Sequence, residues 1–376
     1  MNFASRWPLV PLGDVVEDTQ YGTSMKANEQ GTGVPVLRMN NITYSGSIDI
    51  ADLKHVDLSE AEDERYFVRR GDLLFNRTNS PELVGKMGVW NRDERFAFAG
   101  YLVRLRLNCD RAEPRFVGAW FNTPEMKAML RARAKPSINM SNINATEVLE
   151  LSLVLPPLKE QRRIAEVLDR AEALRAKRRA ALAQLDTLTQ SIFLDIFGDP
   201  ITNPKHQRKM ALGKLIKLKS GEFLPATDMV TSGPFAVLGG NGINGHHDKY
   251  LFEDRQIVIG RVGVYCGCVH VSPPKSWVTD NALYVCECSE DIEFTYFVHA
   301  LTRARLNQYA SQSGQPLVSA SRLYPVEVLV PPLSLQRDFS NRIAAVDKLK
   351  SAHRASLAKL DALFASLQHR AFRGTL

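Results

Sequence analysis

Several arginine, asparagine and lysine side chains stand where they could bind the bases or phosphates of a nucleic acid. In the first half of the chain, Asn76, Arg77 and Asn79 follow an apolar stretch that we expect to be a strand. Arginine offers a planar fork that fits guanine or a phosphate, and asparagine can pair with adenine. Lys86 and Arg38 are expected to flank the same surface, together with Asn40 and Asn41.

The second half of the chain offers a counterpart set. Arg261 follows the apolar residues 257–260, and Asn241 and Asn244 lie in a glycine-rich stretch before it. For any single candidate, a structural or solvated role competes with a base contact, and phosphate contacts should outnumber base contacts. The complete set of candidates is Arg38, Asn40, Asn41, Asn76, Arg77, Asn79, Lys86, Asn241, Asn244, Lys249, Arg261, Lys275 and Arg322.

The glycine-rich stretch, residues 240–245, formally fits the Gly-x-Gly-x-x-Gly pattern of dinucleotide-binding proteins. That site needs a helix immediately afterwards, so that backbone N–H groups meet the pyrophosphate. His246, His247 and the residues after them show no helical pattern. We therefore expect a loop that faces nucleic acid, or a plain turn.

Four cysteines form two Cys-x-Cys pairs, Cys266 with Cys268 and Cys286 with Cys288, on segments that we expect to be neighbouring strands. Four thiolates would suit structural zinc, but zinc-binding pairs are usually separated by two residues. Small buried thiols are the favoured interpretation, and zinc stays open. The pair His246 and His247 is likewise read as exposed polar residues rather than as metal ligands.

Motifs of catalysis are not found in this sequence. It has no Asn-Pro-Pro-Tyr tetrapeptide of amino-methyltransferases, no Gly-x-x-x-x-Gly-Lys phosphate loop, and no carboxylate and lysine cluster of nuclease spacing. We therefore predict no catalytic residue, no metal site and no cofactor bound by this chain. Two alternatives are less favoured: a DNA-binding regulator that acts without partner subunits, and a hydrolase or transferase hidden in the second half.

An internal repeat positions these candidates. Residues 153–198 align without a gap on residues 328–373, an offset of 175, and 15 of the 46 aligned positions are identical. Each copy starts with an apolar triplet and Pro-Pro-Leu, followed by about 40 residues that contain almost no glycine or proline. Because two prolines hold the preceding chain extended, a helix can begin only after them.

Apolar residues recur in both copies at spacings of three, four or seven, which predicts a narrow stripe of the coiled-coil kind. We expect the two helices to bury these stripes against each other. The alternative is that each helix packs only on its own domain. The residues assigned to the helices and their partner contacts are Pro156, Pro157, Gln161, Leu168, Leu185, Leu188, Pro331, Pro332, Gln336, Leu360 and Leu363.

The segments before each helix follow one plan. In the first we expect strands at residues 34–42, 98–107 and 148–155 and a helix at 114–133; in the second, a helix at 292–307. The predicted fold is α+β, with two mixed, β-rich domains related by an internal repeat and joined by two long antiparallel helices that form a coiled coil. The predicted boundaries are residues 1–155, 156–199, 200–330 and 331–376.

Composition sets the remaining limits. A net charge of +7 favours a polyanionic partner, although many basic proteins bind no nucleic acid. Five cysteines, an odd number, and no apolar segment at the N-terminus predict a reducing cytoplasm without disulfides. The apolar runs are too short to span a membrane.

With these features, the chain resembles the specificity subunits of type I restriction-modification systems. The similarity lies in residues 155–164 (LPPLKEQRRI), 193–200 (FLDIFGDP), 74–86 (LFNRTNSPELVGK), 235–245 (FAVLGGNGING) and 371–376 (AFRGTL). It covers nearly the whole chain, and the Pro-Pro-Leu-x-x-Gln-Arg start is its most specific part.

The resemblance implies two target recognition domains, each of which binds one half of an asymmetric bipartite site on double-stranded DNA. It implies that the helices set the distance between the half-sites, which on one face of B-DNA are about one helical turn, roughly 34 to 36 Å, apart. It further implies no catalysis by this chain and assembly with two methyltransferase subunits and two restriction subunits. S-adenosylmethionine, ATP and magnesium would then be bound by those partners. The half-site sequences and the spacing stay open, as does the presence of a restriction subunit.

Overall fold

The protein is described by a computed structural model over residues 7–59, 64–137, 140–311 and 314–376. The chain divides into two compact units. Unit 1 contains Met1–Arg179 and Ala355–Leu376, and unit 2 contains Ala180–Arg354. Both boundaries fall inside a long helix, so each unit contains part of both long helices together with one globular region.

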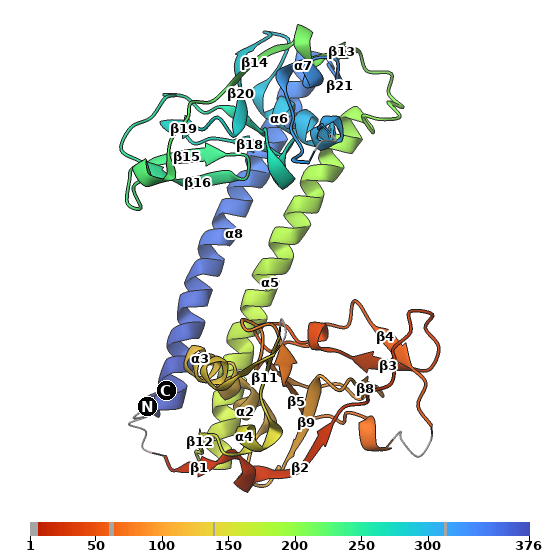
Figure 1. Cartoon of the computed structure of the whole chain (residues 1–376), viewed down its shortest axis with the longest axis vertical. Coiled ribbons are helices and arrows are strands. Elements are labelled where there is room, and N and C mark those ends of the chain that lie inside the picture. The colour runs from red at the N-terminus through yellow and green to blue at the C-terminus, as the bar shows by residue number, and fades with distance from the viewer. Residues whose placement is uncertain (1–6, 60–63, 138–139, 312–313) are drawn as a thin grey trace. The chain divides into compact units, whose positions relative to one another are not determined.

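The main sheet of unit 1 has four antiparallel strands in the order β2 (Val16–Tyr21), β9 (Leu102–Leu107), β5 (Leu73–Asn76) and β7 (Met87–Val89) (Figure 1). All four residues of β5 are buried, as expected for an apolar strand at the centre of a sheet. β5 ends immediately before half-buried Arg77, and the buried residues Thr78 and Asn79 follow.

Smaller sheets complete unit 1. One contains β4 (Lys54–Val56), β3 (Val34–Leu37) and β8 (Ala97–Phe98), with β3 and β8 parallel. Another contains β10 (Lys135–Ser137), β11 (Met140–Asn142) and β6 (Thr78–Asn79), and β1 (Leu9–Pro11) pairs with β12 (Ser152–Val154). The strand predicted at 34–42 ends at Leu37, because a 3-10 turn, Met39–Asn41, follows.

The prediction of one helix at 114–133 is wrong in one respect, because the structure has two helices there. α2 (Pro114–Phe121) ends before Thr123, whose hydroxyl accepts a hydrogen bond from the Met126 backbone N–H and caps α3 (Pro124–Arg133). Pro124 lacks the N–H that a continuous helix would need there. The strand predicted at 148–155 is also partly wrong, because α4 (Ala145–Leu149) precedes the shorter strand β12.

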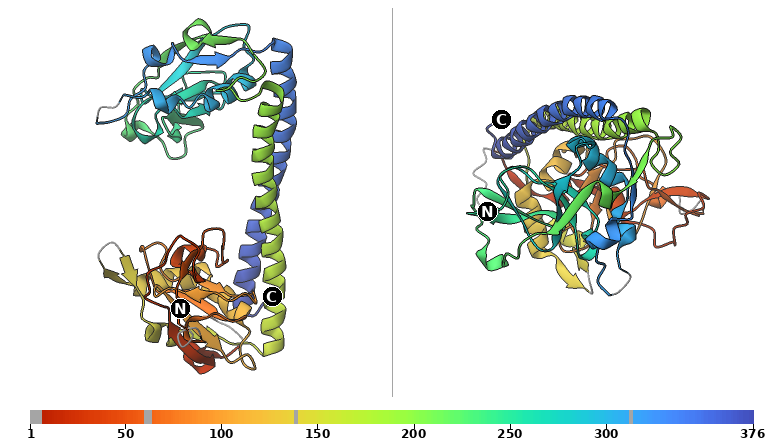
Figure 2. Two further views of the ribbon diagram at one scale, coloured as in Figure 1. Left: turned by 90° about the vertical axis from the view of Figure 1, so that its right-hand side faces the viewer. Right: turned by 90° about the horizontal axis from the view of Figure 1, so that it is seen from above.

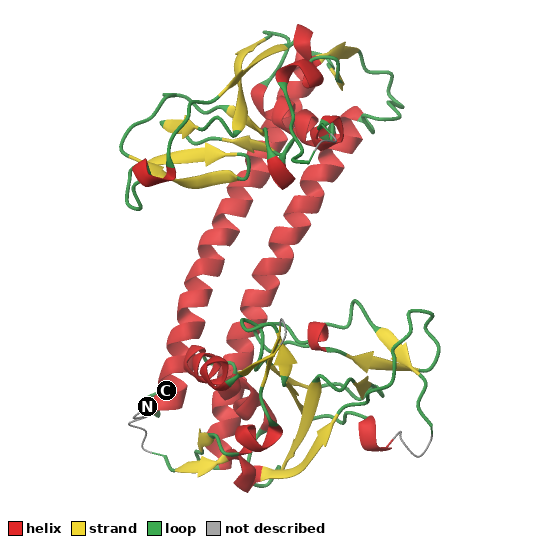
Figure 3. Ribbon diagram, in the orientation of Figure 1, coloured by secondary structure: helices red, strands yellow, loops and turns green. Residues whose placement is uncertain are grey.

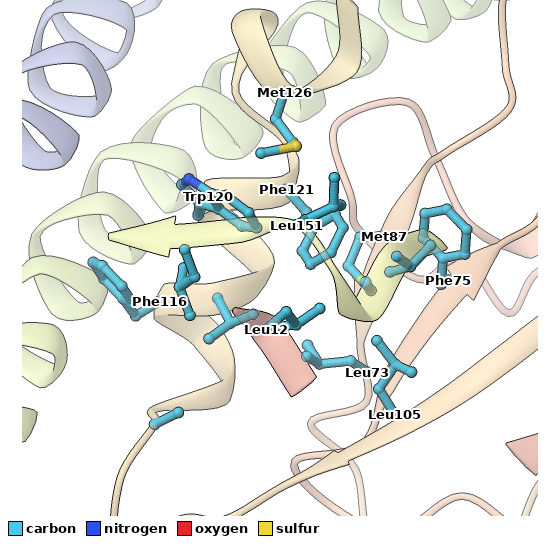
Figure 4. Close-up of a cluster of buried hydrophobic side chains, with 14 of the residues drawn as sticks. Leu12, Leu73, Phe75, Met87, Leu105, Phe116, Trp120, Phe121, Met126 and Leu151 are labelled. Carbon is cyan, nitrogen blue, oxygen red and sulfur yellow. The ribbon is translucent and has the colours of Figure 1, made fainter. Parts of the chain in front are cut away.

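The core of unit 1 lies between the main sheet and helix α2. Phe121 projects from α2 toward Phe75 on β5, with the ring centroids 6.0 Å apart, whereas Phe116 and Trp120 of the same buried cluster lie on the side of α2 that faces the long helices (Figure 4). The Phe116 ring also contacts Phe372 near the end of the second long helix, with the ring centroids 5.3 Å apart. Aromatic packing thus joins the globular region of unit 1 to the helices.

Unit 2 repeats this plan. Its main sheet has the order β14 (Ile216–Ser220), β20 (Ala282–Cys288), β17 (Ile257–Gly260) and β18 (Val269–Val271). A second sheet contains β16 (Gly242–His247), β15 (Phe235–Gly239) and β19 (Ser276–Val278), and β15 and β19 are parallel as β3 and β8 are. β13 (Lys209–Ala211) pairs with β21 (Glu327–Leu329). The predicted α+β repeat is confirmed.

The helices of unit 2 are shorter than predicted. α6 (Phe294–Arg303) covers only part of residues 292–307, and a separate 3-10 turn, Leu306–Tyr309, follows it. Arg305 lies between them with a positive φ of 48°, which an α-helix cannot contain. α7 (Ala320–Leu323) then leads into β21.

The two long helices, α5 (Leu158–Phe197) and α8 (Leu333–Arg373), begin directly after their Pro-Pro pairs (Figure 3). Pro157 O accepts hydrogen bonds from the N–H groups of Glu160 and Gln161, and Pro332 O does the same in the second copy. Each helix is followed by a glycine with positive φ, Gly198 or Gly374, the usual end of a helix.

Within each unit, α5 and α8 lie side by side and antiparallel (Figure 2). In unit 1, Arg175 of α5 contacts Asp361 of α8, and Arg163 donates a hydrogen bond to the carbonyl of Leu376, which follows α8. In unit 2, Asp186 and Phe193 of α5 contact Lys350 and Phe339 of α8.

The predicted apolar stripe is buried only toward the helix ends, at residues such as Ile164, Leu168 and Ile343. Leu174, Leu188, Leu349 and Leu363 are between 43% and 52% exposed, because ion-paired residues occupy the seam beside them. None of the helices in the described part of the chain has the length and apolar character needed to cross a bilayer.

Candidate nucleic-acid interface

Arg77 lies at the edge of unit 1 where β5 ends. Its N–H donates to Tyr101 O over 3.1 Å, and its carbonyl accepts from the N–H of Ile143 over 2.9 Å. The guanidinium lies over the ring of Tyr21, 5.1 Å from its centroid, and Tyr21 is the last residue of β2. Three segments thus fix a half-buried arginine beside two exposed tyrosines, Tyr21 and Tyr101.

Arg261 occupies the equivalent place in unit 2, at the end of β17. Its N–H donates to Asn281 O over 2.9 Å, and its carbonyl accepts from the N–H of Val318 over 2.8 Å. Its Nη1 donates to Ser220 Oγ (3.1 Å), on the last residue of β14, and to Asp280 O (3.3 Å). The structure therefore brings Arg77 and Arg261 to matching positions, with different side chains around them.

Four other predicted residues of unit 1 lie inside it. Asn76 and Asn79 are buried and hydrogen-bond to each other over 3.1 Å. Buried Asn41 donates to the carbonyls of Asp49 and Asp52. Lys86 is buried and donates to Met39 O and Ile42 O, and burial lowers its pKa. These side chains support the loops of the unit, and a contact with nucleic acid would require the unit to open.

Arg38 and Asn40 precede and follow Met39 on the surface of unit 1. Half-buried Arg38 forms an ion pair with Asp52 over 2.9 Å, while Asn40 is exposed. Asn40 can thus contact a ligand directly, whereas Arg38 would have to give up its ion pair with Asp52 to bind a ligand.

In unit 2 the glycine-rich stretch is a tight hairpin between β15 and β16, so the helix that a dinucleotide site requires is not there. Gly242 has a φ of 87°, which a residue with a side chain rarely adopts. Asn241 and Asn244 are exposed on this hairpin. Both are therefore accessible to a ligand.

The remaining candidates of unit 2 are exposed. Lys249 lies after β16, and Arg322 lies on α7. Lys275 forms an ion pair with Glu253 over 3.4 Å and lies near the ring of Tyr250. These positions suit phosphate contacts better than base contacts, because long exposed cations tolerate many geometries.

The cysteines are arranged differently from the prediction. Cys286 and Cys288 lie on β20, but Cys266 and Cys268 flank Gly267 in a turn rather than on a strand. Cys266 is buried, and burial raises its pKa, but Cys268 and Cys288 are exposed and Cys286 is half-buried, so the interpretation as buried thiols is wrong for these three. Among the residues that the structure describes, no group of three or more His, Cys, Asp or Glu side chains is placed to hold a metal ion. His247 Nδ1 instead lies 3.1 Å from Asp228 O.

Sequence reasoning assigned Gln161 and Gln336 to the helices without finding what they bind. Buried Gln161 accepts a hydrogen bond from the Glu113 N–H at the start of α2 (2.8 Å) and donates to the carbonyls of Arg111 and Pro156. Gln336 makes the same set with Glu293 N–H, Asp291 O and Pro331 O. The signal was present in the repeated Pro-Pro-Leu-x-x-Gln, which places a glutamine at the same position of both helices.

The other predicted helix residues differ in burial. Pro156, Pro331 and Leu168 are buried, Leu185 and Leu360 are half-buried, and Pro157, Pro332, Leu188 and Leu363 are exposed. Near the start of α8, burial of His299 against Phe339 lowers its pKa to about 4, so this histidine is neutral at pH 7.

Comparison with known proteins relates the chain to one family. Residues 4–184 match the family model of the type I restriction modification DNA specificity domain. A protein of Methanocaldococcus jannaschii described as a type I restriction enzyme MjaX specificity subunit is 24% identical over 372 residues, covering 91% of this chain and 87% of that protein. The EcoKI specificity subunit of Escherichia coli K12 is 30% identical over 195 residues, which are 50% of this chain and 42% of that protein.

Solved structures share the fold. The S subunit of a type I restriction-modification system from M. genitalium superimposes with a TM-score of 0.66, at 16% identity, over 98% of this chain and 96% of that chain. A chain from a structure of type I R-M complex assembly and conformational transition gives a TM-score of 0.54 at 18% identity, over 98% of each chain.

The repeated fold and the matched domain define a DNA specificity protein. Residues 4–184 thus contain a type I restriction modification DNA specificity domain, and the chain is similar over most of its length to a specificity subunit of a type I restriction-modification system.

Proposed function

We propose that this subunit recognises an asymmetric bipartite DNA site, with residues 1–155 reading one half and residues 200–330 the other. The observation that carries the proposal is the matched placement of Arg77 and Arg261 in different surroundings. Tyr21 and Tyr101 flank the first arginine, and Ser220 and Asn281 flank the second. Equivalent anchors with unlike neighbours are suited to two half-sites of different sequence.

The segments 156–199 and 331–376 would set the spacing between the half-sites and bind two methyltransferase subunits. The chain itself would catalyse no reaction. Methyl transfer with S-adenosylmethionine, and ATP- and magnesium-dependent work by two restriction subunits, would belong to the partners. The proposed place of action is the cytoplasm.

The test is to express the chain with its cognate methyltransferase subunit and to map methylated adenines across the host genome. We expect one split sequence that loses methylation when this chain is removed. Replacement of residues 1–155 by the corresponding domain of another specificity subunit should change one half of the sequence only. Methylation at an undivided sequence, or a change in both halves, would contradict the proposal.

Binding of methyltransferase subunits gives a second prediction. Leu174 and Leu349 correspond through the repeat, and both are about half exposed on the long helices. Exposed leucines at matching places are suited to a partner helix present in two copies. The double variant Leu174→Glu, Leu349→Glu should therefore co-purify at least about tenfold less methyltransferase subunit, while its own unfolding free energy changes by less than about 0.5 kcal/mol.

Leu194→Glu is the matched control. Leu194 is 47% exposed on α5, but its counterpart in the repeat is His369. Co-purification should stay near the parent level in this variant. Equal loss in the control and the double variant would mean that a general effect of the new charges, and not docking at Leu174 and Leu349, weakens the complex.

A further inference from the structure

An ion pair joins the two long helices in unit 1. Arg175 Nε of α5 lies 2.6 Å from Asp361 Oδ1 of α8, and the guanidinium stacks over the ring of Phe364, 4.4 Å from its centroid. The Arg175 side chain is only 15% exposed. The arginine is therefore enclosed between the helices.

Unit 2 contains the corresponding ion pair. Lys350 Nζ of α8 lies 2.9 Å from Asp186 Oδ1 of α5 and donates a hydrogen bond to Thr189 Oγ1 over 3.0 Å. Lys350 is buried. Here too the cation is enclosed, and its partners are a carboxylate and a second residue three positions further along the facing helix.

The two pairs correspond through the repeat, and in unit 1 Arg175 also pairs with Glu172 while Asp361 also lies 3.7 Å from Arg179. With the repeat offset of 175 residues, Arg175 corresponds to Lys350, Asp186 to Asp361, and Thr189 to Phe364. The cation and its neighbour have changed together, because an arginine stacks on phenylalanine whereas a lysine donates to threonine. Each pair takes its cation from one copy and its aspartate from the other, as in a twofold-symmetric interface.

Little apolar packing supports the helices between these contacts. No side chain of α5 between Arg175 and Thr189 is buried, and none of α8 between Lys350 and Gln368 is buried; both stretches lie wholly within the described residues. Arg175 therefore lies at one end of the stretch of α5 without buried side chains, and Lys350 lies at one end of the corresponding stretch of α8. On α5, Arg175 and Asp186 are separated by about 16 Å along the helix axis.

We infer that the reciprocal pairs Arg175–Asp361 and Lys350–Asp186 are positioning residues that hold α8 against α5 in one register and so make the protein strict about the spacing of its half-sites. The inference rests on the proposed function. Two helices that are held together at two positions bend less than one helix alone. A stiffer connection between the two DNA-reading domains therefore tolerates fewer distances between the half-sites. Released pairs would let the protein accept sites that are one or two base pairs too short or too long.

The experiment uses the full chain with its methyltransferase subunits and a panel of DNA sites in which the cognate gap is lengthened or shortened by one and two base pairs. Asp361→Lys combined with Asp186→Lys places like charges opposite both cations. The ratio of methylation rates at the cognate and shifted gaps should fall about tenfold in this variant. Reversal of all four residues, Arg175→Asp, Asp361→Arg, Lys350→Asp and Asp186→Lys, should restore the ratio in part, because Glu172 and Arg179 keep their charges beside the reversed pair in unit 1.

Asp338→Lys is the control, because Asp338 pairs with Arg342 inside α8 and not across the helices. An equal fall in rate at every gap would assign the pairs a purely structural role and overturn the inference. A fourfold variant with the same low gap ratio as the variant Asp361→Lys, Asp186→Lys would also overturn the inference. If the parent chain directs methylation to no split site, the proposed function itself fails; if it does and the reversals leave the gap ratio unchanged, only this inference fails.

Discussion

Gln161→Ala is expected to lower the unfolding free energy of unit 1 by about 3 kcal/mol. The substitution removes three hydrogen bonds and leaves the Glu113 N–H and the carbonyls of Arg111 and Pro156 without this partner. Buried groups left unpaired cost about 1–3 kcal/mol each, so the loss exceeds that of an ordinary surface change. Urea unfolding followed by tryptophan fluorescence measures it, since Trp7, Trp90 and Trp120 lie in unit 1.

Two further variants separate the hydrogen bonds from the general effect of a change in the helix start. Lys159→Ala alters an exposed residue in the same turn and should leave the midpoint unchanged. Gln161→Glu keeps the size and the acceptor for Glu113 N–H but cannot donate to the two carbonyls. It should be as unstable as Gln161→Ala. Parent-like stability of Gln161→Glu would show that the donated bonds contribute nothing.

Arg77→Met should weaken binding of cognate DNA by about tenfold to a hundredfold, the usual worth of a good arginine contact. Methionine keeps much of the apolar stem and removes the guanidinium that lies over Tyr21. Arg77→Lys should recover only part of the affinity, because lysine keeps the charge but not the planar fork. Affinity is measured by titration of the assembled methyltransferase complex with labelled DNA at fixed salt.

Arg261→Met serves as the reciprocal control for Arg77→Met. If each arginine acts on one half-site, Arg77→Met has already lost its contact with the first half-site. A base change in that half-site should then lower the DNA affinity of Arg77→Met little further, but it should lower the DNA affinity of Arg261→Met by its full amount. The opposite should hold for a base change in the second half-site. Full additivity in every combination would contradict a contact between these arginines and separate half-sites. Thermal unfolding of both variants shows whether the units stay folded.

The sequence allowed the architecture to be predicted better than the site. The repeated Pro-Pro start and the helical spacing that follows are local features, so the long helices and the duplicated plan could be predicted. The break before Pro124 was missed because an apolar face continues on both sides of it. Only the Thr123 cap and the missing N–H of Pro124 mark the two helices as separate.

The candidate site was harder to predict, because burial of a polar residue depends on distant parts of the chain. Asn76 and Lys86 have residue types that suit DNA, yet they bind groups within unit 1, among them carbonyls more than 40 residues away for Lys86. Tyr21 and Ser220 were not predicted, since only the pairing of β2 with β9 and of β14 with β20 brings them to the arginines. The ion pairs across the helices were missed for the same reason.

The glutamine at each helix start binds main-chain groups alone: one N–H and one carbonyl of its globular region, and one carbonyl of the Pro-Pro pair. Every residue type except proline can supply such an N–H, and every residue can supply a carbonyl. These hydrogen bonds are therefore indifferent to the side chains of the globular region, whereas the contact of Phe116 with Phe372 is not. A recombination event that exchanges one whole globular region for another would preserve the hydrogen bonds of the glutamine while replacing the surface that the region carries.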